Sequence, residues 1–313
     1  MVRGVETMKY AQPLLLALFA LIATGCVEGL QEVYELKDTR IIGMQANPPE
    51  IALSSEGEQV VSVKPFIYLP EGVTVTSSTW TFCPFAAGGE LGYRCFLESC
   101  LVDISDAVNE DRELAFEPIK KVIECLESLD TSDAPTGGDT SGSDADAFDS
   151  LPTQVRLTIE TSDGQVREAV KRIPIWFEEP EVGLNRNPEI ASVSIGETVV
   201  SVASEPVSAT VVTEGEGAFE RTKVDLGFEA VAESFDQYVA GETTRREDAQ
   251  WTLFVTEGDL GVIGNRLVGD QAKGEWAIEP SEELPELIEL WVALRDGRTG
   301  QSIEGPFYFT PRK

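Results

Sequence analysis

Apolar and polar residues alternate one by one along several short stretches of the chain. In residues 155–160, Val155, Leu157 and Ile159 are each followed by a polar residue, and the same period of two recurs at residues 288–294. This period predicts half-buried β-strands. An Asp-Gly pair, which tolerates the positive φ of a tight hairpin, follows each stretch at residues 163–164 and 296–297. Short strands punctuated by proline and glycine are typical of a β-sandwich.

One segment has the period of a helix instead. Residues 116–129, "FEPIKKVIECLESL", place four apolar residues on one helical face, with Pro118 at the first turn, where proline is favoured. The pattern predicts a short helix, stapled to the sandwich through Cys125. The predicted apolar face consists of Ile119, Val122, Ile123 and Leu126.

The strand pattern is duplicated. Residues 49–63, "PEIALSSEGEQVVSV", and 188–202, "PEIASVSIGETVVSV", are identical at 11 of 15 positions. Four further pairs follow in the same order, which indicates that one module occurs twice, with different insertions in each copy. We therefore predict two domains, at residues 40–180 and 181–313. The four pairs are Trp80 with Trp251, 88–92 with 257–261, 151–164 with 284–297, and 174–177 with 306–309.

The second copy runs "NPEIASVSIGETVVSV", "WTLFVTEGDLG", "GEWAIEP" and "LIELWVALRDGRTGQS". This order resembles the immunoglobulin-like and PKD-like repeats of bacterial surface proteins. The resemblance implies an all-β fold of two tandem immunoglobulin-like β-sandwich domains, the first with a disulfide-stapled insertion containing a short helix. It also implies that Trp80 and Trp251 pack between the sheets. The resemblance does not decide whether Trp276 lies in the core. Trp291 lies out of phase with the apolar face, so we expect Trp291 to be partly exposed.

The insertions differ between the copies. The first contains a Cys-rich insertion at residues 83–129 and an acidic stretch at 130–149, which has too few apolar residues to order itself and is predicted to be a mobile loop. The second has its extra residues between Val211 and Trp251, where we expect an elongated hairpin or a strand pair near residues 224–231. There Arg245 and Arg246 form either a solvated turn or, as the alternative, a contact site.

The acidic stretch also suggests a weak calcium site, because hard cations take several oxygen ligands. Its spacing lacks the glycine and terminal glutamate of an EF-hand, so a solvated loop is the favoured interpretation. We predict no other metal and no cofactor. The candidate calcium ligands are Asp139, Asp144, Asp146 and Asp149.

The longest apolar run, residues 14–23, is shorter than the roughly 20 residues that span a bilayer. Lys9 precedes it and "ATGC" follows, as in a secretory signal. The residues that follow the apolar run resemble the lipobox of bacterial lipoproteins, although Ala23 stands three residues before the cysteine, where leucine is usual. The resemblance implies a signal peptide at residues 1–25, started at Met1 or Met8, then lipidation of Cys26 and a flexible tether to residue 39. The alternative is an ordinary signal peptide with an incidental cysteine.

Four cysteines remain beyond the anchor. An even, clustered set in an exported chain predicts two disulfides, with three possible pairings that the sequence leaves open. A zinc site is the alternative, since four residues separate two of the cysteines, but the chain has no histidine. The four are Cys83, Cys95, Cys100 and Cys125.

Charge and residue types limit the chemistry. The net charge of −31 disfavours nucleic acid and anionic membrane surfaces as partners. The absence of histidine excludes Ser-His-Asp and Cys-His nucleophiles and His-ligated metals. A glycosidase-like carboxylate pair remains open, but no two residues stand out. We expect no enzyme.

Together these features predict a lipoprotein with a non-catalytic binding or structural role. It would be attached to a membrane through the N-terminal lipid and present two immunoglobulin-like modules. Val27 after the anchor, rather than aspartate, implies the outer membrane of a Gram-negative bacterium, facing either the periplasm or the cell surface. One alternative is an accessory subunit of an envelope complex for secretion, motility or transport. Another is a carbohydrate-binding module. Envelope proteins, extracellular proteins and glycans are the possible partners.

Overall fold

The computed structural model describes residues 34–55, 59–87, 92–129, 149–215, 220–240, 243–261, 264–267, 269–279 and 282–313. Residues Tyr34–Lys313 belong to one compact unit. The signal peptide, Cys26 and most of the acidic stretch, including Asp139, Asp144 and Asp146, lie outside the described residues. The predictions for these segments therefore remain predictions.

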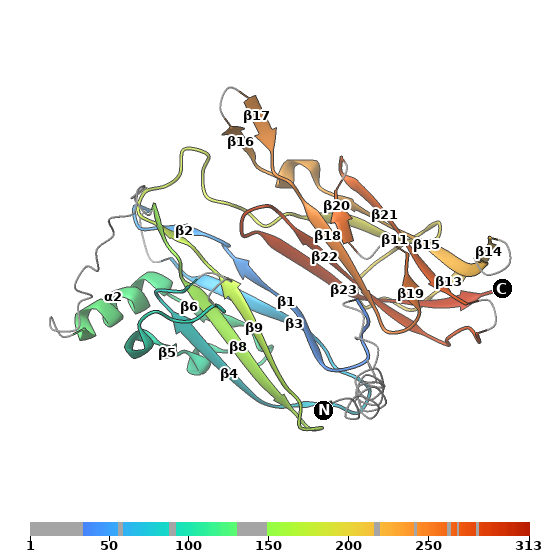
Figure 1. The fold of residues 1–313 in the computed structure, drawn as a ribbon, viewed down its shortest axis with the longest axis horizontal. Coiled ribbons are helices and arrows are strands. Elements are labelled where there is room, and N and C mark those ends of the chain that lie inside the picture. The colour runs from blue at the N-terminus through green and yellow to red at the C-terminus, as the bar shows by residue number, and fades with distance from the viewer. Residues whose placement is uncertain are drawn as a thin grey trace, which may run out of the picture. The chain divides into compact units, whose positions relative to one another are not determined.

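The first sandwich contains two main sheets and a small third one (Figure 1). One sheet has the order β1 (Arg40–Asn47), β3 (Val61–Tyr68), β6 (Leu114–Phe116). The second has the order β5 (Val102–Asp103), β4 (Val75–Cys83), β8 (Gln154–Thr161), β9 (Val166–Arg172). In the third, β10 (Ile175–Trp176) lies between β2 (Ile51–Ala52), to which it is parallel, and β7 (Ser150–Leu151). Their buried side chains form one core, which includes Trp80, Phe82 and Leu157.

The second sandwich has one sheet in the order β12 (Thr198–Val200), β11 (Ile190–Ile195), β15 (Arg221–Ala230), β21 (Gln271–Ile278), β19 (Asp259–Leu260), with β14 (Val212–Glu214) also on β15. The other sheet has the order β13 (Val207–Thr210), β23 (Gln301–Arg312), β22 (Ile288–Arg295), β18 (Gln250–Val255), β20 (Gly264–Arg266). A separate core lies between them and includes Trp251, Trp276 and Phe309. A hairpin of β16 (Gln237–Ala240) and β17 (Thr243–Arg246) stands apart.

Both sandwiches have the strand order of an immunoglobulin fold. In the second, β11, β15, β21 and β19 correspond to strands A, B, E and D, and β18, β22 and β23 to C, F and G. In the first, β1, β3 and β6 correspond to A, B and E, and β4, β8 and β9 to C, F and G. The strand C tryptophans, Trp80 and Trp251, are 0% and 4% exposed. The predicted fold class is therefore confirmed, and so is the position of both tryptophans in the cores.

The duplication is visible in the strands, with one exception. Residues 154–161 and 288–295 each form strand F of their own sandwich. Residues 175–176 form β10, which pairs in parallel with β2, and residues 307–309 belong to β23, which pairs in parallel with β13. The most similar segments, 49–63 and 188–202, differ in their pairing. The first leads from β2 into β3, whereas the second folds back on itself as the β11–β12 hairpin, turning at Gly196 with φ of 58°. High local identity therefore did not preserve the pairing.

The predicted helix forms as α2 (Pro118–Ser128), but its buried face differs from the prediction. Val122 and Cys125 are 4% exposed, and Ile119 packs against the core of the first sandwich. Ile123 and Leu126 are instead 49% and 52% exposed. The disulfide to Cys125 turns the cysteine side of the helix inward, which leaves these two residues in solvent.

The second insertion also differs from its prediction. Residues 224–230 do not form the predicted extra pair of strands. They belong to β15, a central strand whose even-numbered residues are buried. The extra pair is the β16–β17 hairpin further along the chain. Trp291, which was expected to be partly exposed, is only 7% exposed, and Trp276 is fully buried. Trp291 is indeed out of phase with the core, but its face of the sheet is covered by the first sandwich.

The tether is shorter than predicted. Tyr34, Leu36 and Thr39 are at most 5% exposed. The Leu36 amide donates to the Val255 carbonyl at 2.8 Å, and the Val255 amide donates to the Tyr34 carbonyl at 3.0 Å. Residues 34–36 therefore pair in parallel with the end of strand β18 rather than forming a flexible tether. Residues 26–33 of the predicted tether lie outside the described residues.

Candidate functional site

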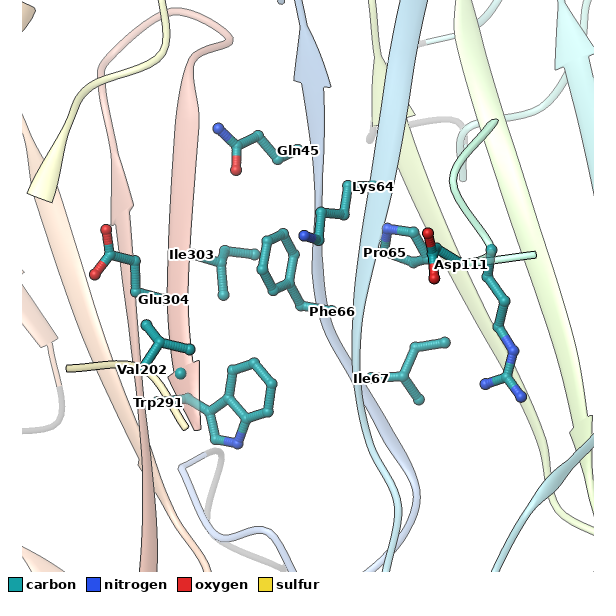
Figure 2. Close-up of a pocket in the computed structure, with 12 residues that line it drawn as sticks. Gln45, Lys64, Pro65, Phe66, Ile67, Asp111, Val202, Trp291, Ile303 and Glu304 are labelled. Carbon is teal, nitrogen blue, oxygen red and sulfur yellow. The ribbon is translucent and has the colours of Figure 1, made fainter. Parts of the chain in front are cut away.

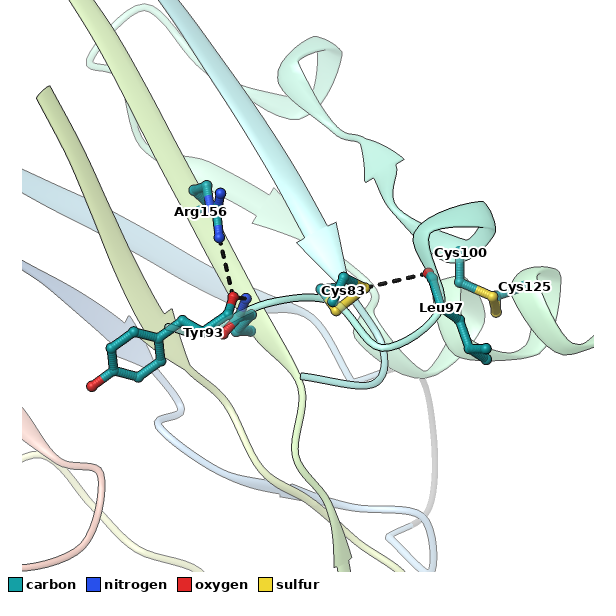
Figure 3. The surroundings of a disulfide bond; sticks show 8 residues. Cys83, Tyr93, Leu97, Cys100, Cys125 and Arg156 are labelled. Atoms are coloured by element: carbon teal, nitrogen blue, oxygen red, sulfur yellow. Dashed lines mark hydrogen bonds between the residues drawn. A yellow bond between two sulfur atoms is a disulfide. The ribbon is translucent and has the colours of Figure 1, made fainter. Parts of the chain in front are cut away.

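Two features stand out from the paired sheets: the Cys-rich insertion of the first sandwich, and the region where the two sandwiches meet, called the junction below. In the insertion, Cys83 bonds Cys95 and Cys100 bonds Cys125 (Figure 3). The prediction of two disulfides is confirmed, and the structure selects one of the three pairings. Cys83 ends strand β4, and Cys100 lies in the short helix η2 (Glu98–Cys100), so the first bond holds the loop to the sheet and the second holds α2 to η2.

Backbone hydrogen bonds reinforce the first disulfide. The Phe96 amide donates to the Phe85 carbonyl at 2.8 Å, closing the loop between the two cysteines. The Tyr93 carbonyl accepts from Gln154 Nε2 at 2.6 Å and from Arg156 Nη2 at 3.1 Å, both on strand β8. Figure 3 shows the Tyr93 ring pointing away from both disulfides. The loop is thus fixed to the sheet on two sides, although its Tyr93 ring is exposed.

The insertion presents large apolar side chains to solvent. Of the fourteen large hydrophobic residues that are exposed in the described part of the chain, five lie in residues 93–126. Each is within two residues of a disulfide-bonded cysteine, so the covalent bonds limit how far they can move. Exposed apolar residues that covalent bonds hold in place are suited to contact a partner. We call this set the insertion face; it consists of Tyr93, Phe96, Leu101, Ile123 and Leu126.

An apolar cluster joins the sandwiches at the junction. Trp291 and Ile303 of the second sandwich are buried together with Ile42 of the first, and Leu36 of the N-terminal segment joins them. The Phe66 ring meets Trp291 edge to face, with 6.3 Å between ring centroids. Burial of this many apolar side chains is the main force that holds the two sandwiches together.

Beside this cluster a groove of about 550 Å³ opens between the sandwiches (Figure 2). Phe66 and Ile303 face each other from opposite sandwiches, and Trp291 lies below them in the figure. Lys64 Nζ lies 5.5 Å from the Phe66 ring centroid, a cation–π contact. Because Trp291 is only 7% exposed, its ring has no free face on which a sugar could stack.

A buried carboxylate organises the polar half of the junction. Glu50, which is 2% exposed, precedes β2 in the first sandwich. Its Oε2 accepts from Trp176 Nε1 at 3.0 Å, from the Asn185 amide at 3.2 Å and from Arg298 Nη2 at 2.7 Å. Its Oε1 accepts from Thr299 Oγ1 at 2.9 Å. Glu50 therefore ties together its own domain, the segment between the domains and the β22–β23 hairpin of the second sandwich.

Asp296 shapes that hairpin. Its Oδ1 accepts from the amides of Arg298 at 2.8 Å and Gly300 at 3.0 Å, and its Oδ2 accepts from Asn185 Nδ2 at 3.0 Å. Burial raises the pKa of Asp296, while these hydrogen bonds oppose the rise. The Asp-Gly pair thus forms a hairpin as predicted, but Asp296 also serves as an anchor of the junction.

Glu247 is the least satisfied member of the network. It is 7% exposed, and its Oε2 accepts from the Asp236 amide at 3.1 Å. Its Oε1 lies 3.7 Å from Arg298 Nη1 and makes no hydrogen bond in the described part of the chain. Burial, together with the negative charges of Asp296 and Asp236, raises the pKa of Glu247 to about 7. The junction therefore contains a carboxyl group that titrates near neutral pH.

The other sequence candidates are only partly described. Asp149 is exposed, and its carbonyl accepts from the Phe177 amide. Among the described residues no group of three or more acidic residues or cysteines could hold a metal ion. Arg246 differs from the predicted solvated turn: its Nη1 donates to Asp270 Oδ1 at 2.6 Å, and its guanidinium lies 4.3 Å from the Phe235 ring centroid. The side chain of Arg245 lies outside the described residues.

Sequence reasoning missed the polar junction. Glu50 and Glu189 occupy equivalent positions of the repeated "PEI" segment, yet Glu189 is exposed. The one available signal was the polar segment between the copies, "GLNRNPE", whose asparagines both bridge the domains. Asn187 Nδ2 donates to the Ala46 carbonyl at 2.7 Å, and its Oδ1 accepts from the Gln301 amide at 2.9 Å. Such pairings between distant segments have no local sequence pattern.

No helix in the described part of the chain is long and apolar enough to cross a membrane. No family model matches the chain, and no curated protein matches it.

Three solved structures are similar over most of this chain. The fibronectin(III)-like modules of Clostridium thermocellum CbhA are 10% identical with a TM-score of 0.21, covering 88% of this chain and 94% of theirs. The D00–D0 domain of intimin is 7% identical with a TM-score of 0.21, covering 85% and 99%. Dimeric latent PorU from Porphyromonas gingivalis is 9% identical with a TM-score of 0.20, covering 88% and 34%. At scores this low the similarities support no conclusion, and the fold assignment depends on this chain's own strand order and cores.

Proposed function

We propose that this protein is a membrane-anchored, non-catalytic display module. Its two immunoglobulin-like sandwiches act as one stiff body that presents the insertion face to a protein partner. The observation that supports this proposal best is the insertion face itself. Five large apolar side chains are exposed there, on a segment held by two disulfides. Preorganised apolar residues lose little conformational entropy on binding, so such a face suits partner recognition.

The junction supports the second part of the proposal. Domains joined only by a flexible linker move independently by default. Here an apolar cluster and the Glu50 network connect the sandwiches on two sides. A stiff body transmits force and orientation from an anchor to a binding face, which a flexible string of domains does not.

The anchor is the lipid predicted for Cys26. Two acyl chains on this residue would attach the protein to a membrane stably, since each buried methylene contributes about 0.8 kcal/mol. Mass spectrometry of the protein extracted from native membranes tests this part. We expect a diacylated N-terminal Cys26 and the loss of four hydrogens from the other four cysteines. An N-terminus elsewhere, or an unmodified Cys26, would disprove the anchor.

Partner capture from native membranes tests the display function. We expect the wild-type protein to recover a partner in a fixed ratio, and the double variant Ile123→Asp, Leu126→Asp to lose it. Val199→Asp is the matched control, because Val199 is 68% exposed but lies on the second sandwich. Equal recovery by all three proteins would contradict a role for the insertion face. Recovery of glycans rather than proteins would favour the carbohydrate-binding alternative.

A further inference from the structure

A second cavity lies next to the polar junction, on the side of strand β9. It has a volume of about 190 Å³ and is lined by residues of β9, of the β22–β23 hairpin and by Tyr93 of the stapled loop. Four of its side chains are cationic and one is acidic. On a chain with a net charge of −31 this local excess of positive charge is unusual. The cations are Lys171, Arg172, Arg295 and Arg298, and the acid is Asp296.

The charges inside the protein do not fully compensate these cations. Arg298 is bound to Glu50 and lies near Glu247. The three acceptor contacts of Asp296 are already occupied by Asn185 and two backbone amides. Within the described part of the chain, the guanidinium groups of Arg172 and Arg295 form no ion pair or hydrogen bond, although both lie close enough to Lys171 to repel its charge. The cavity thus brings together cations that repel one another.

Two buried side chains that line the cavity also have donors left over. Lys171 is 7% exposed, and its Nζ donates one hydrogen bond, to the Thr299 carbonyl at 2.6 Å. An ammonium group has three donors, so two remain. Gln301 is 8% exposed, and its Nε2 has no hydrogen-bond partner in the described structure. Buried donors without acceptors are costly and rare, so each needs an explanation, and a bound ion is one of them.

We propose that this cavity is a binding site for a small oxyanion, which carries its negative charge on phosphate or carboxylate oxygens. Oxyanions accept several charge-assisted hydrogen bonds at once, and guanidinium groups bind them through two parallel N–H donors. Lys171, Arg172 and Arg295 supply the charge, and Tyr93 also lines the cavity. The cavity is large enough for a single phosphate or a small polycarboxylate, and too small for a nucleotide.

The electrostatic surroundings of Lys171 favour the binding of an anion. Burial, helped by the charges of Arg295 and Arg172, lowers the pKa of Lys171 to about 8, although Asp296 and Glu50 act in the opposite direction. A bound anion would restore the positive charge. The site also spans both sandwiches, because β9 belongs to the first and the hairpin to the second. A bound anion would therefore strengthen the junction.

Calorimetric titration of the purified full-length protein tests the proposal, with sodium phosphate and sodium citrate as separate probes and sodium chloride holding the ionic strength constant. We expect saturable binding of at least one probe with a dissociation constant of about 1 mM or below. The probe that binds more tightly identifies the class of oxyanion. The double variant Arg172→Ala, Arg295→Ala should bind at least about tenfold more weakly, because two charge-assisted hydrogen bonds are lost.

Lys120→Ala is the matched control, since Lys120 is an exposed cation on α2, remote from the cavity lining. It should bind as the wild type does. Thermal unfolding without ligand shows whether each variant is folded, because both arginines are exposed and their loss should leave the cores intact. The proposal is overturned if neither phosphate nor citrate binds saturably, or if the folded double variant binds as tightly as the wild type.

Discussion

The Cys-rich insertion and the junction both hold separate segments of the chain together, but they do so by different chemistry. Both connect segments that are distant in sequence. The insertion uses two covalent bonds, with sequence separations of 12 and 25 residues, and leaves apolar side chains exposed. The junction joins residues more than 240 positions apart, such as Glu50 and Arg298, without a covalent bond, and buries almost everything it uses.

The difference shows which kind of segment each type of interaction can hold in place. A disulfide acts mainly by restricting the unfolded chain, so it holds a small insertion whose own core is too small to order it. The junction is large enough to bury a cluster of apolar residues, and the polar network inside it specifies one relative arrangement. The junction is therefore sensitive to charge and pH, whereas the insertion is sensitive to reduction. The following predictions separate the two.

The largest effect should come from removing the carboxylate at the centre of the junction. Glu50→Ala leaves Arg298 and three other donors without their acceptor, which should cost about 3–5 kcal/mol. Guanidinium chloride unfolding followed by tryptophan fluorescence measures this loss, and small-angle scattering should show a larger radius of gyration.

Glu189→Ala is the matched control for that experiment. Glu189 occupies the equivalent position of the repeated segment but is exposed, so its loss should change stability by less than about 0.5 kcal/mol. Equal effects of the two substitutions would show that the buried network does not hold the junction.

The next effect concerns the second disulfide. Replacing Cys100 and Cys125 together by serine should cost about 3 kcal/mol, as expected for a closed loop of 25 residues. Hydrogen exchange should become faster in α2, Pro118–Ser128, while β1, Arg40–Asn47, which contacts the second sandwich, keeps its protection. Loss of protection in both would mean that the insertion and the junction are not independent.

The pH dependence of the junction is the third prediction. Because the pKa of Glu247 is about 7 in the folded protein and 4.5 in the unfolded chain, the folded state binds more protons between these values. The contribution of Glu247 to stability is therefore complete below about pH 4.5 and is lost as the pH rises through about 7. The loss should amount to roughly 1–3 kcal/mol.

Unfolding of the wild type and of Glu247→Gln at pH 5 and pH 8 measures this effect. Glutamine does not ionise, so the variant should lose less stability between the two pH values than the wild type. Glu197→Gln, at an exposed position, is the control and should retain the wild-type pH dependence. If Glu247→Gln kept the pH dependence of the wild type, Glu247 would not be the group that lowers stability as the pH rises.

The smallest effect tests which face of α2 is buried. Ile123→Ala should change stability by less than about 0.5 kcal/mol, because Ile123 is 49% exposed. Val122→Ala removes a smaller side chain but should cost about 1–2 kcal/mol, because Val122 is 4% exposed and packs against the core. A larger loss of stability from Ile123→Ala than from Val122→Ala would show that α2 buries the face predicted from the helical pattern.

Local patterns predicted the fold well where burial follows a single period. The alternation at residues 155–160 is that of a half-buried strand, and Val155, Leu157 and Ile159 are all at most 1% exposed. The helical pattern predicted α2 but not its buried face, because a disulfide competes with hydrophobicity in turning a short helix. The phase of the apolar pattern predicts that Trp291 is partly exposed, but the first sandwich covers it.

The candidate site was predicted only in part. An even cysteine count predicted the two disulfides, since unpaired cysteines are rare in exported proteins. Their pairing depends on which loops come together, and four cysteines allow three choices. Glu50 and Lys171 have no local signature, because they have partners in the other domain.

The sequence alone therefore predicted many of the strands, the duplication, the class of fold and the presence of two disulfides, because each depends on residues close together or on simple counts. Only the tertiary structure decided which cysteines pair, which face of α2 is buried, and how Glu50, Asp296 and Glu247 meet at the junction. The physical reason is that burial and charge compensation depend on what is near in space. Two nearly identical "PEI" segments show this, since one glutamate is buried among four donors and the other is in solvent.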